Sequence, residues 1–129
     1  MPNDISVLVV DDNSAITDLL KVSIENALGI GVYPCYDGME ALAYLACVGV
    51  MPKLIISDID MPIVNGVDLA RRLYNDERYR GIPIVLASSY AHEKLVTTPN
   101  VVERVSKPYS IYTIGGIVRT RLGIEDREE

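Results

Sequence analysis

Polar side chains that could bind a cation or a phosphate follow four of the short apolar runs in this sequence. Asp11 and Asp12 follow the first run, Asp58 and Asp60 the third, Ser88 and Ser89 the fourth, and Lys107 the fifth. Carboxylates that crowd together repel one another and raise each other's pKa unless a cation neutralises them. A hard divalent cation such as Mg²⁺ takes oxygen ligands and is the usual choice beside phosphates, and a lysine ammonium suits a phosphoryl oxygen. These residue types therefore indicate a magnesium-dependent phosphate site, provided that the runs meet in one sheet.

Each of these residues also has an ordinary structural explanation. An aspartate directly after a strand often caps the next helix, and a lysine before a proline, such as Lys107, is usually a surface residue. The interpretation as a site depends on all of the groups falling at the ends of four different runs. Chance placement rarely produces that pattern.

The apolar runs alternate with longer segments in which apolar residues recur at helical spacing. The runs predict strands at Ile5–Val10, Val32–Tyr36, Leu54–Ile56, Ile82–Ala87 and Val101–Val105. The longer segments predict helices at Ser14–Leu28, Met39–Ala46, Gly66–Glu77, Ala91–Val96 and Ile111–Leu122. This alternation predicts an α/β fold, a doubly wound, five-stranded parallel sheet with helices on both faces. Ligands of such folds bind beyond the carboxyl ends of the strands, which is where the polar groups would meet.

Two of the predicted helices are weak. Ala91–Val96 leaves room for only a short helix before Thr98-Pro99-Asn100 interrupts it. The last helix contains Gly115 and Gly116, each of which costs about 1 kcal/mol relative to alanine in a helix interior. We therefore expect the sequence to specify these two helices least firmly.

Composition excludes several classes of protein. The chain has 129 residues, with 12 Lys and Arg, 18 Asp and Glu and one His, so its net charge is −6. This length predicts one domain over residues 1–129, with a core at about residues 4–122 and a frayed acidic tail. The excess of acid, and eight Tyr without Phe or Trp, argue against unaided binding to nucleic acid. No apolar run is long enough for a signal peptide or a membrane span, so we expect a soluble, cytoplasmic protein.

Cysteine usage points to the same compartment. Cys35 and Cys47 are too few for a disulfide scaffold, and their spacing is not that of a CxxC motif. We expect two buried thiols in a reducing cytosol rather than a metal site.

Four segments of the sequence resemble the receiver domains of two-component response regulators. They are Val7–Asn13, Ile55–Pro62 with Gly66 after it, Pro83–Ser88 and Ser106–Pro108. No one segment is decisive, but the four in this order and spacing are specific, and the resemblance extends over the whole chain. It implies the flavodoxin-like (βα)5 fold of a chemotaxis-regulator-like domain, with strand order 2-1-3-4-5.

The resemblance also implies the chemistry. Asp58 would be the phosphoacceptor, and Ser88 and Lys107 would bind the phosphoryl group. The Lys107–Pro108 peptide bond would be cis, as in the family. Such a domain promotes its own phosphorylation and dephosphorylation and is not an enzyme that turns over a separate substrate.

The cofactor implied by the resemblance is Mg²⁺. Its ligands would be the carboxylates of Asp11, Asp12 and Asp58 together with the backbone carbonyl of Asp60. Gly66 would permit a turn that a Cβ atom would obstruct.

The implied partner is a phosphohistidine donor, either a histidine kinase or a histidine phosphotransfer domain. We expect it to dock near Ala15, Ile16 and Leu19 and near Pro108-Tyr109. The signal would pass to an output domain or a downstream protein that is not part of this chain, with no direct binding to nucleic acid and no membrane span.

Two features depart from the family pattern. Arg104 stands where the family usually has an aromatic switch residue, and the segment Ser88–Lys107 is a few residues shorter than usual, which shrinks the fourth helix. Tyr90 could take over the switch or could simply pack. In the family that the sequence resembles, the positions of Asp60 and Tyr90 modulate the lifetime of the phosphoryl group, so we expect these two residues to set the dephosphorylation rate here. His92, the only histidine, is expected to be exposed to solvent.

Three alternative functions use similar residues. A phosphorylation-independent interaction module could share the fold, although every phosphorylation position is filled here. A flavodoxin-like cofactor binder would need a loop rich in Gly, Ser or Thr after the first strand, and the sequence lacks one. Asp58-Ile59-Asp60 resembles the nucleophile motif of haloacid-dehalogenase-type phosphatases, but Pro62 stands where that motif has Thr or Val.

Overall fold

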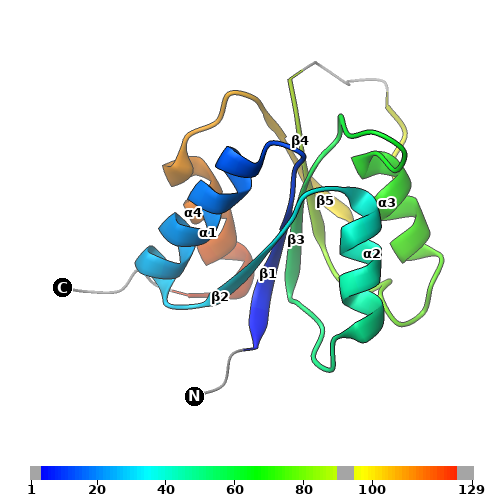
Figure 1. Cartoon of the computed structure of the whole chain (residues 1–129), viewed down its shortest axis with the longest axis horizontal. Coiled ribbons are helices and arrows are strands. Elements are labelled where there is room, and N and C mark those ends of the chain that lie inside the picture. Colours follow the sequence, from blue (N-terminus) through cyan, green and yellow to red (C-terminus); the bar gives the residue numbers. More distant parts are fainter. Residues whose placement is uncertain (1–3, 90–94, 125–129) are drawn as a thin grey trace.

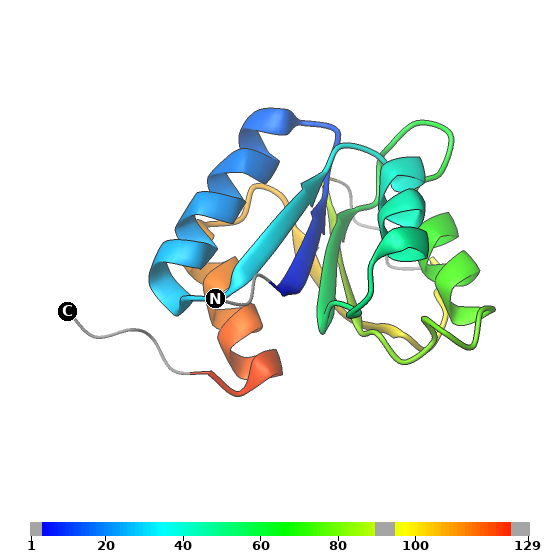
Figure 2. The same cartoon turned by 60° about the horizontal axis from the view of Figure 1, so that its bottom comes forward.

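The computed structural model describes residues 4–89 and 95–124, which form a parallel sheet between two layers of helices. The strands are β1 (Ile5–Val10), β2 (Gly31–Cys35), β3 (Leu54–Asp58), β4 (Ile84–Ser88) and β5 (Val101–Ser106), in the order β2-β1-β3-β4-β5. The helices of the described residues are α1 (Ser14–Leu28), α2 (Gly38–Cys47), α3 (Gly66–Tyr74) and α4 (Ile111–Leu122). Helices α1 and α4 cover one face of the sheet, and α2 and α3 cover the other (Figure 1). Figure 2 shows the same two layers from a second direction.

The three central strands are buried on both faces, which explains why they appear in the sequence as nearly continuous apolar runs. Along β1, Leu8 and Val10 belong to the core beneath α2 and α3, whereas Val7 and Val9 belong to the core beneath α1 and α4. Every residue of β3 and β4 is buried, but no residue of β5 is fully buried. The ends of β1, β3 and β4 are therefore held by core packing, and the end of β5 much less so.

Each helix begins and ends at residues suited to that position. The side chains of Asn13, Asp37, Asn65 and Ser110 cap α1 to α4 by accepting backbone N–H groups of the first turn. Helices α1 and α4 end at Gly29 and Gly123, both in the left-handed conformation that glycine adopts easily. Among the described residues, no helix is long and apolar enough to cross a membrane.

The fold class and the strand order predicted from the sequence are confirmed, and the differences lie at element ends. β3 continues beyond Ile56 to Asp58, so the aspartate is the last residue of the strand rather than the start of a loop. α3 ends at Tyr74, not Glu77, because the next N–H, that of Asp76, donates to the carbonyl of Leu73 three residues back and so leaves the α-helical pattern. α4 forms over its whole predicted length despite its two glycines.

The fourth predicted helix is wrong at its C-terminal end. Leu95 and Val96 are not helical, because the chain there approaches a turn in which the Val101 N–H donates to the carbonyl of Thr98 over 3.0 Å. The remainder of that predicted helix, together with Tyr90, His92 and the acidic tail at 125–129, lies outside the described residues.

The two cysteines differ in environment. Cys35 is buried as predicted, and burial, with smaller contributions from the charges of Glu40 and Asp37, raises the pKa of its thiol to about 12. The prediction for Cys47 is wrong, because this residue is exposed. α2 buries the stripe that contains Ala41 and Leu45, and a residue two positions beyond Leu45 points away from that stripe.

Candidate functional site

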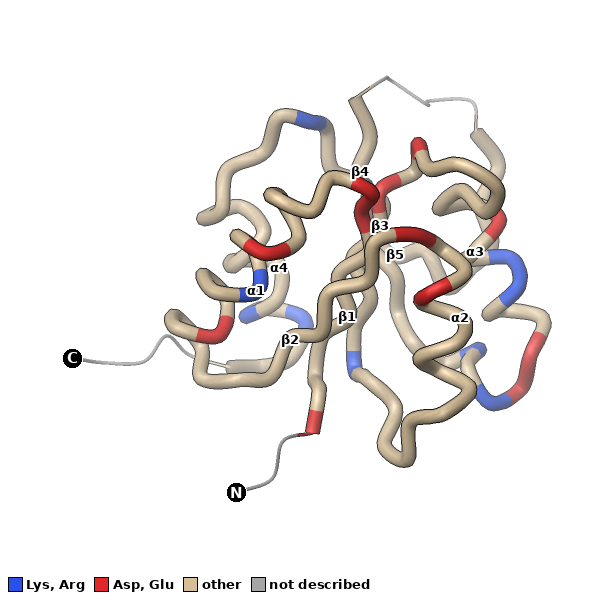
Figure 3. The backbone as a smooth tube through the Cα atoms, in the orientation of Figure 1, with Lys and Arg blue, Asp and Glu red and all other residues tan. Residues whose placement is uncertain are grey.

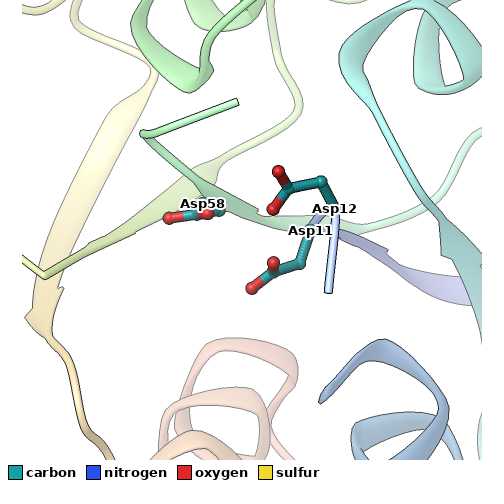
Figure 4. Close-up of side chains that lie close together, drawn as sticks. All are labelled: Asp11, Asp12 and Asp58. Atoms are coloured by element: carbon teal, nitrogen blue, oxygen red, sulfur yellow. The ribbon is translucent and has the colours of Figure 1, made fainter. Parts of the chain in front are cut away.

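The carboxyl ends of β1 and β3 bring three aspartates together. Val10 of β1 lies opposite Ser57 of the neighbouring β3, so the residues that follow, Asp11 and Asp58, lie beside each other. One carboxylate oxygen from each of Asp11, Asp12 and Asp58 lies within 4.8 Å of the other two, and Figure 4 shows the three side chains side by side. Asp11 and Asp58 are only 3% and 5% exposed, whereas Asp12 is open to solvent. Figure 3 shows how acidic residues gather at this end of the sheet.

Lys107 reaches the same cluster from the end of β5. Its Nζ atom lies 3.0 Å from Oδ2 of Asp11 and 3.3 Å from Oδ1 of Asp58. The pairing of Ser88 with Ser106 and the hydrogen bond from the Lys107 N–H to the Ser88 carbonyl, 2.8 Å long, bring the lysine to this edge. The Lys107–Pro108 bond is cis, as expected.

The negative charge of the carboxylates in the cluster is only partly balanced by the positive charge of Lys107. Burial and the negative charge of Asp11 raise the pKa of Asp58 above its ordinary value, although the charge of Lys107 and its hydrogen bond act in the opposite direction. Burial alone would lower the pKa of Lys107, but its hydrogen bond to Asp11 and the charges of Asp11 and Asp58 outweigh burial and raise it. The lysine therefore stays charged, and one ammonium does not fully compensate the carboxylates around it. Such a donor set suits an added cation.

Ser88 and Asp60 meet at the edge of this cluster. The Ser88 hydroxyl donates to Oδ2 of Asp60 over 3.2 Å, and the Asp60 N–H donates to Oδ1 of Asp58 over 3.4 Å. The group of three mutually close carboxylates does not include Asp60. Asp60 thus links the hydroxyl at the end of β4 to the carboxylate at the end of β3.

The backbone around Asp58 is fixed from two sides. Gly66, the first residue of α3, packs so closely that a Cβ atom there would overlap the carbonyl oxygen of Asp58, which agrees with the predicted need for glycine. The buried hydroxyl of Ser57 donates to the same carbonyl oxygen over 2.9 Å. We missed Ser57 in the sequence, although a polar residue between the apolar run and Asp58 was a signal that could have found it.

Asp11 is oriented by the start of α1. The backbone N–H of Asn13 donates to Oδ1 of Asp11 over 2.9 Å, while the Asn13 side chain accepts the N–H groups of Ala15 and Ile16. The same residue therefore begins the helix and fixes one carboxylate. Nothing in the sequence indicated this backbone contact.

Arg104, the residue at the usual aromatic position, binds the connection between β4 and β5. It is exposed, and its Nη2 atom donates to the carbonyl of Leu95 over 2.7 Å and to the Thr97 hydroxyl over 3.4 Å. The Leu95 side chain lines a cleft of about 560 Å³ next to Asp60. The arginine is therefore tied to a segment that borders the site.

The residues predicted to contact a phosphate donor differ in their exposure. Ala15 and Leu19 are exposed on α1, with Leu19 49% exposed, and Ile16 is half-buried. Tyr109 is half-buried, and burial followed by the charge of Asp11 raises its pKa. The charge of Asp11 acts on Tyr109, so this side chain lies near the cluster.

Comparison with known proteins gives a consistent match. The family described as response regulator receiver domain matches residues 7–115. The polar-differentiation response regulator DivK of Brucella ovis is 30% identical over 121 residues, which cover 92% of this chain and 96% of DivK. RpaA of Synechocystis sp., a DNA-binding dual master transcriptional regulator, is 35% identical over 83 residues, which cover 64% of this chain and 33% of RpaA. This chain therefore spans about a third of that regulator's length.

A solved structure supports the same relationship. The response regulator protein TrrA from Thermotoga maritima, in complex with Mg(2+)-BeF, superposes with a TM-score of 0.76 at 26% identity. The superposition covers 92% of this chain and 99% of TrrA. The family match over residues 7–115 includes the elements that carry the acidic cluster.

Proposed function

Because the chain belongs to the receiver domains of two-component response regulators, we propose that it accepts a phosphoryl group on Asp58 from a phosphohistidine. The donor is a histidine kinase or a histidine phosphotransfer domain. A bond forms between phosphorus and an Asp58 carboxylate oxygen, while the bond between phosphorus and the imidazole nitrogen breaks and the electron pair returns to the donor's histidine. The observation that carries the proposal is the contact of Lys107 Nζ with both Asp11 and Asp58, at 3.0 and 3.3 Å, in a nearly buried acidic cluster.

The donor set of this cluster fits a magnesium ion. Three carboxylates lie within 4.8 Å of one another, and burial and Asp11 raise the pKa of Asp58, which indicates negative charge that a cation would offset. We propose that Asp11, Asp12 and Asp58, with the backbone carbonyl of Asp60, hold Mg²⁺. When bound, Mg²⁺ supplies positive charge against the oxygens of the transferring phosphoryl group. The bound state of TrrA, a complex with Mg(2+)-BeF, is consistent with this assignment.

The chain's own residues have separate tasks in this proposal. Asp58 attacks as the carboxylate, and Lys107 favours that form by its charge and hydrogen bond. After transfer the ammonium of Lys107 pairs with a phosphoryl oxygen while it keeps its contact with Asp11. The Ser88 hydroxyl turns from Asp60 Oδ2, to which it donates in this structure, toward another phosphoryl oxygen.

The lifetime of the phosphoryl group then depends on what lies next to Asp58. Asp60 contacts both Asp58 and Ser88, so its side chain borders the path of an attacking water molecule. We propose that Asp60, together with Tyr90, sets the rate of phosphate release. Unchanged phosphate release after Asp60→Asn and Tyr90→Ala would contradict this assignment.

The response itself is assigned to another domain or protein. Residues 1–129 act as one receiver unit in this proposal, and phosphorylation changes the surface that this unit offers to a partner. RpaA, of which this chain spans 33%, is a DNA-binding regulator, so its remaining length is available for other tasks. The acidic balance of this chain, with a net charge of −6, is consistent with an output that lies elsewhere.

The decisive experiment is phosphorylation by acetyl phosphate with Mg²⁺, followed by intact-mass analysis and mapping of the modified residue. We expect the chain to gain one phosphoryl group, at a site that is stable in acid and labile in base. Asp58→Asn should abolish the gain, and chelation of Mg²⁺ should prevent it. Labelling that persists in Asp58→Asn would overturn the proposal.

Asp68→Asn is the matched control, because Asp68 is a partly exposed aspartate at the start of α3 that is paired with Arg71. This variant should label like the wild type. A folded wild-type chain that takes no label from acetyl phosphate or from a phosphohistidine donor would favour the phosphorylation-independent module instead.

A further inference from the structure

The loop between β3 and α3 carries a strained residue at its tip. Ile63 has a φ angle of 68°, and the Val64 N–H donates to the Pro62 carbonyl across it over 2.7 Å. A three-residue turn closed in this way, with a positive φ at its central residue, is the rare and strained form of the γ-turn. A positive φ is especially unfavourable for a β-branched side chain such as isoleucine. The backbone of this turn is therefore held against the preference of its central residue.

Burial does not explain why an isoleucine occupies this position. The Ile63 side chain is 89% exposed, so it contributes little to the core. Glycine or asparagine adopts a positive φ more easily, and neither would remove a buried side chain from the fold. Strained residues persist where the surrounding structure holds them, and they are frequent at functional sites. Contact with another molecule would give this side chain the burial that it lacks in the isolated chain.

The turn is fixed next to the phosphoacceptor. Val64, which follows the tip, is buried. The Gly66 N–H donates to the Ile59 carbonyl over 2.9 Å, so the loop leaves the end of β3 and returns to it at the residue directly after Asp58. Ile63 thus projects from a closed loop at the carboxyl end of β3, the same end of the sheet as the acidic cluster (Figure 1).

A protein that transfers a phosphoryl group to Asp58 has to contact this loop. Asp58 is only 5% exposed, so the donor reaches it by pressing against the loops that follow the strands. Asp60, three residues before Ile63, is exposed, and its N–H donates to the Asp58 carboxylate. A donor that places its phosphohistidine beside Asp58 therefore covers the loop of Asp60 and Ile63. An apolar side chain inside that contact leaves water on docking, and its burial stabilises the complex.

We propose that Ile63 is a docking and specificity residue for the protein phosphodonor, which receives the Ile63 side chain in an apolar depression of its own surface. This inference rests on the proposed transfer from a phosphohistidine to Asp58. The strained turn holds the side chain in its projecting position before the donor arrives, so that docking does not have to order the loop. A donor that presents a charged group at this point is rejected, because the charge would lose water without gaining a partner.

The expected contacts of the donor then lie on both sides of the acidic cluster. Leu19 of α1 is 49% exposed and is already expected to contact the donor. Ile63 precedes α3, and α1 and α3 cover opposite faces of the sheet (Figures 1 and 2). Two apolar side chains on different layers would thus position the donor above Asp58.

The rates of phosphoryl transfer from a protein donor and from a small donor test the proposal. The protein donor is the phosphorylated histidine kinase or histidine phosphotransfer domain of the same cell that labels the wild type fastest, and the small donor is acetyl phosphate. Ile63→Asn should lower kcat/KM for the protein donor by about tenfold, as expected for the loss of one apolar side chain buried on docking. The loss should appear in KM, because Ile63 has no part in the chemistry at Asp58. Labelling by acetyl phosphate, which does not need a docking surface, should keep the wild-type rate.

Matched variants separate docking from general effects. Ile63→Leu keeps an apolar side chain and should accept the phosphoryl group like the wild type. Val50→Asn makes the same kind of change at another exposed apolar residue, 53% exposed in the loop that precedes β3 at the far end of the sheet, and should change neither rate. Thermal unfolding should show Ile63→Asn to be at least as stable as the wild type, because asparagine tolerates a positive φ. Misfolding would then not explain its slower transfer.

Each other outcome has a distinct meaning. Unchanged transfer from the protein donor in Ile63→Asn would overturn the docking role and leave the proposed function intact. Equal slowing with both donors would also contradict it, because Ile63 would then act on the acidic cluster rather than on docking. The same holds if acetyl phosphate labels the wild type but no phosphohistidine protein of its cell does. A folded wild type that neither kind of donor labels would instead remove the proposed function, and this inference with it.

Discussion

The cluster at the ends of β1 and β3 and the connection between β4 and β5 border one another, yet they are held very differently. Asp11 and Asp58 are almost completely buried, and their oxygens contact backbone N–H groups and Lys107. In the connection, Thr98 Oγ1 and Asn100 Oδ1 are buried without any hydrogen-bond partner. A buried polar atom without a partner destabilises the fold by about 1 to 3 kcal/mol. The acidic cluster is therefore fixed by many contacts, whereas the described part of the connection contains buried polar atoms that make no hydrogen bond.

This difference indicates which part of the molecule can rearrange its conformation at small cost. In a receiver domain, the proposed chemistry at Asp58 needs fixed distances, whereas a signal needs a segment that can rearrange at small cost. Leu95 of the connection lines a cleft that also contains Asp60, so the two regions touch. If these contacts decide stability, a substitution that disturbs the acidic cluster should cost more than one in the connection.

The largest effect is expected from Gly66→Ala. The new methyl group would overlap the carbonyl oxygen of Asp58 and lie close to the backbone of Ile59, neither of which can move without shifting the end of β3. We expect a loss of about 2 to 3 kcal/mol in the free energy of unfolding, at the upper end for overpacking. Urea denaturation measures that loss, and the rate of labelling by acetyl phosphate should fall with it.

Gly81→Ala is the control for this prediction, since a Cβ at Gly81 would meet nothing within 4 Å. It should change neither quantity noticeably. If Gly66→Ala were as stable and as readily labelled as Gly81→Ala, the end of β3 would be more adaptable than its contacts indicate.

Asp58→Asn should stabilise the protein in the absence of Mg²⁺. Burial and the charge of Asp11 raise the pKa of Asp58, so the folded state binds its proton more tightly than the unfolded state does. Stability is therefore lost as pH rises from the ordinary pKa of 3.8 through the raised value. At pH 7 we expect the amide to be more stable than the wild type, because it removes a buried charge that Lys107 does not fully compensate.

Thermal unfolding as a function of pH measures this effect. The advantage of Asp58→Asn should shrink as the pH falls below the ordinary pKa, because the carboxyl group is then neutral in both states. It should also shrink when Mg²⁺ is added at pH 7. A variant that is less stable than the wild type at pH 7 without Mg²⁺ would show that Lys107 already balances the cluster.

The fold and most of the cluster could be predicted because both depend on short-range patterns. Buried parallel strands leave continuous apolar runs, and residues just after such runs must meet at one edge of the sheet, which brings Asp11, Asp58 and Lys107 together. The contacts that orient these side chains were not predictable. The N–H of Asn13 has no sequence signature, and the contact of Gly66 with the Asp58 carbonyl depends on how α3 packs.

The connection between β4 and β5 resisted prediction for a different reason. The spacing of Leu95 and Val96 suits a helix, but the turn at Thr98–Val101 and the edge position of β5 override that local preference. The exposure of Cys47 was also not predictable from local sequence. Its burial depends on which side of α2 meets the sheet, and an apolar helix sequence with a single charged residue does not specify that side.

Thr98→Val should stabilise the protein slightly. The substitution replaces a buried hydroxyl that has no hydrogen-bond partner with a methyl group of similar size, so we expect a gain of up to about 1 kcal/mol in the free energy of unfolding. Thr17→Val is the matched control, because the Thr17 hydroxyl donates to the carbonyl of Ser14 over 3.0 Å. That variant should lose about 1 kcal/mol. Equal losses in the two variants would mean that the Thr98 hydroxyl has a partner in solution, and the contrast between the two regions would weaken.

The smallest effect on overall stability is expected from Arg104→Ala, which removes the hydrogen bonds to Leu95 and Thr97. Because the arginine is exposed, global stability should change by less than about 0.5 kcal/mol. Amide hydrogen exchange within residues 95–100 should nevertheless become faster, because a local opening no longer has to break these bonds. Arg72→Ala, which removes an exposed arginine on α3, should leave exchange in that segment unchanged. If Arg104→Ala also left it unchanged, packing of Leu95 alone would hold the connection. Faster exchange within residues 95–100, together with unaltered labelling at Asp58, would show instead that the Arg104 side chain holds this part of the connection without affecting the acidic cluster that it borders.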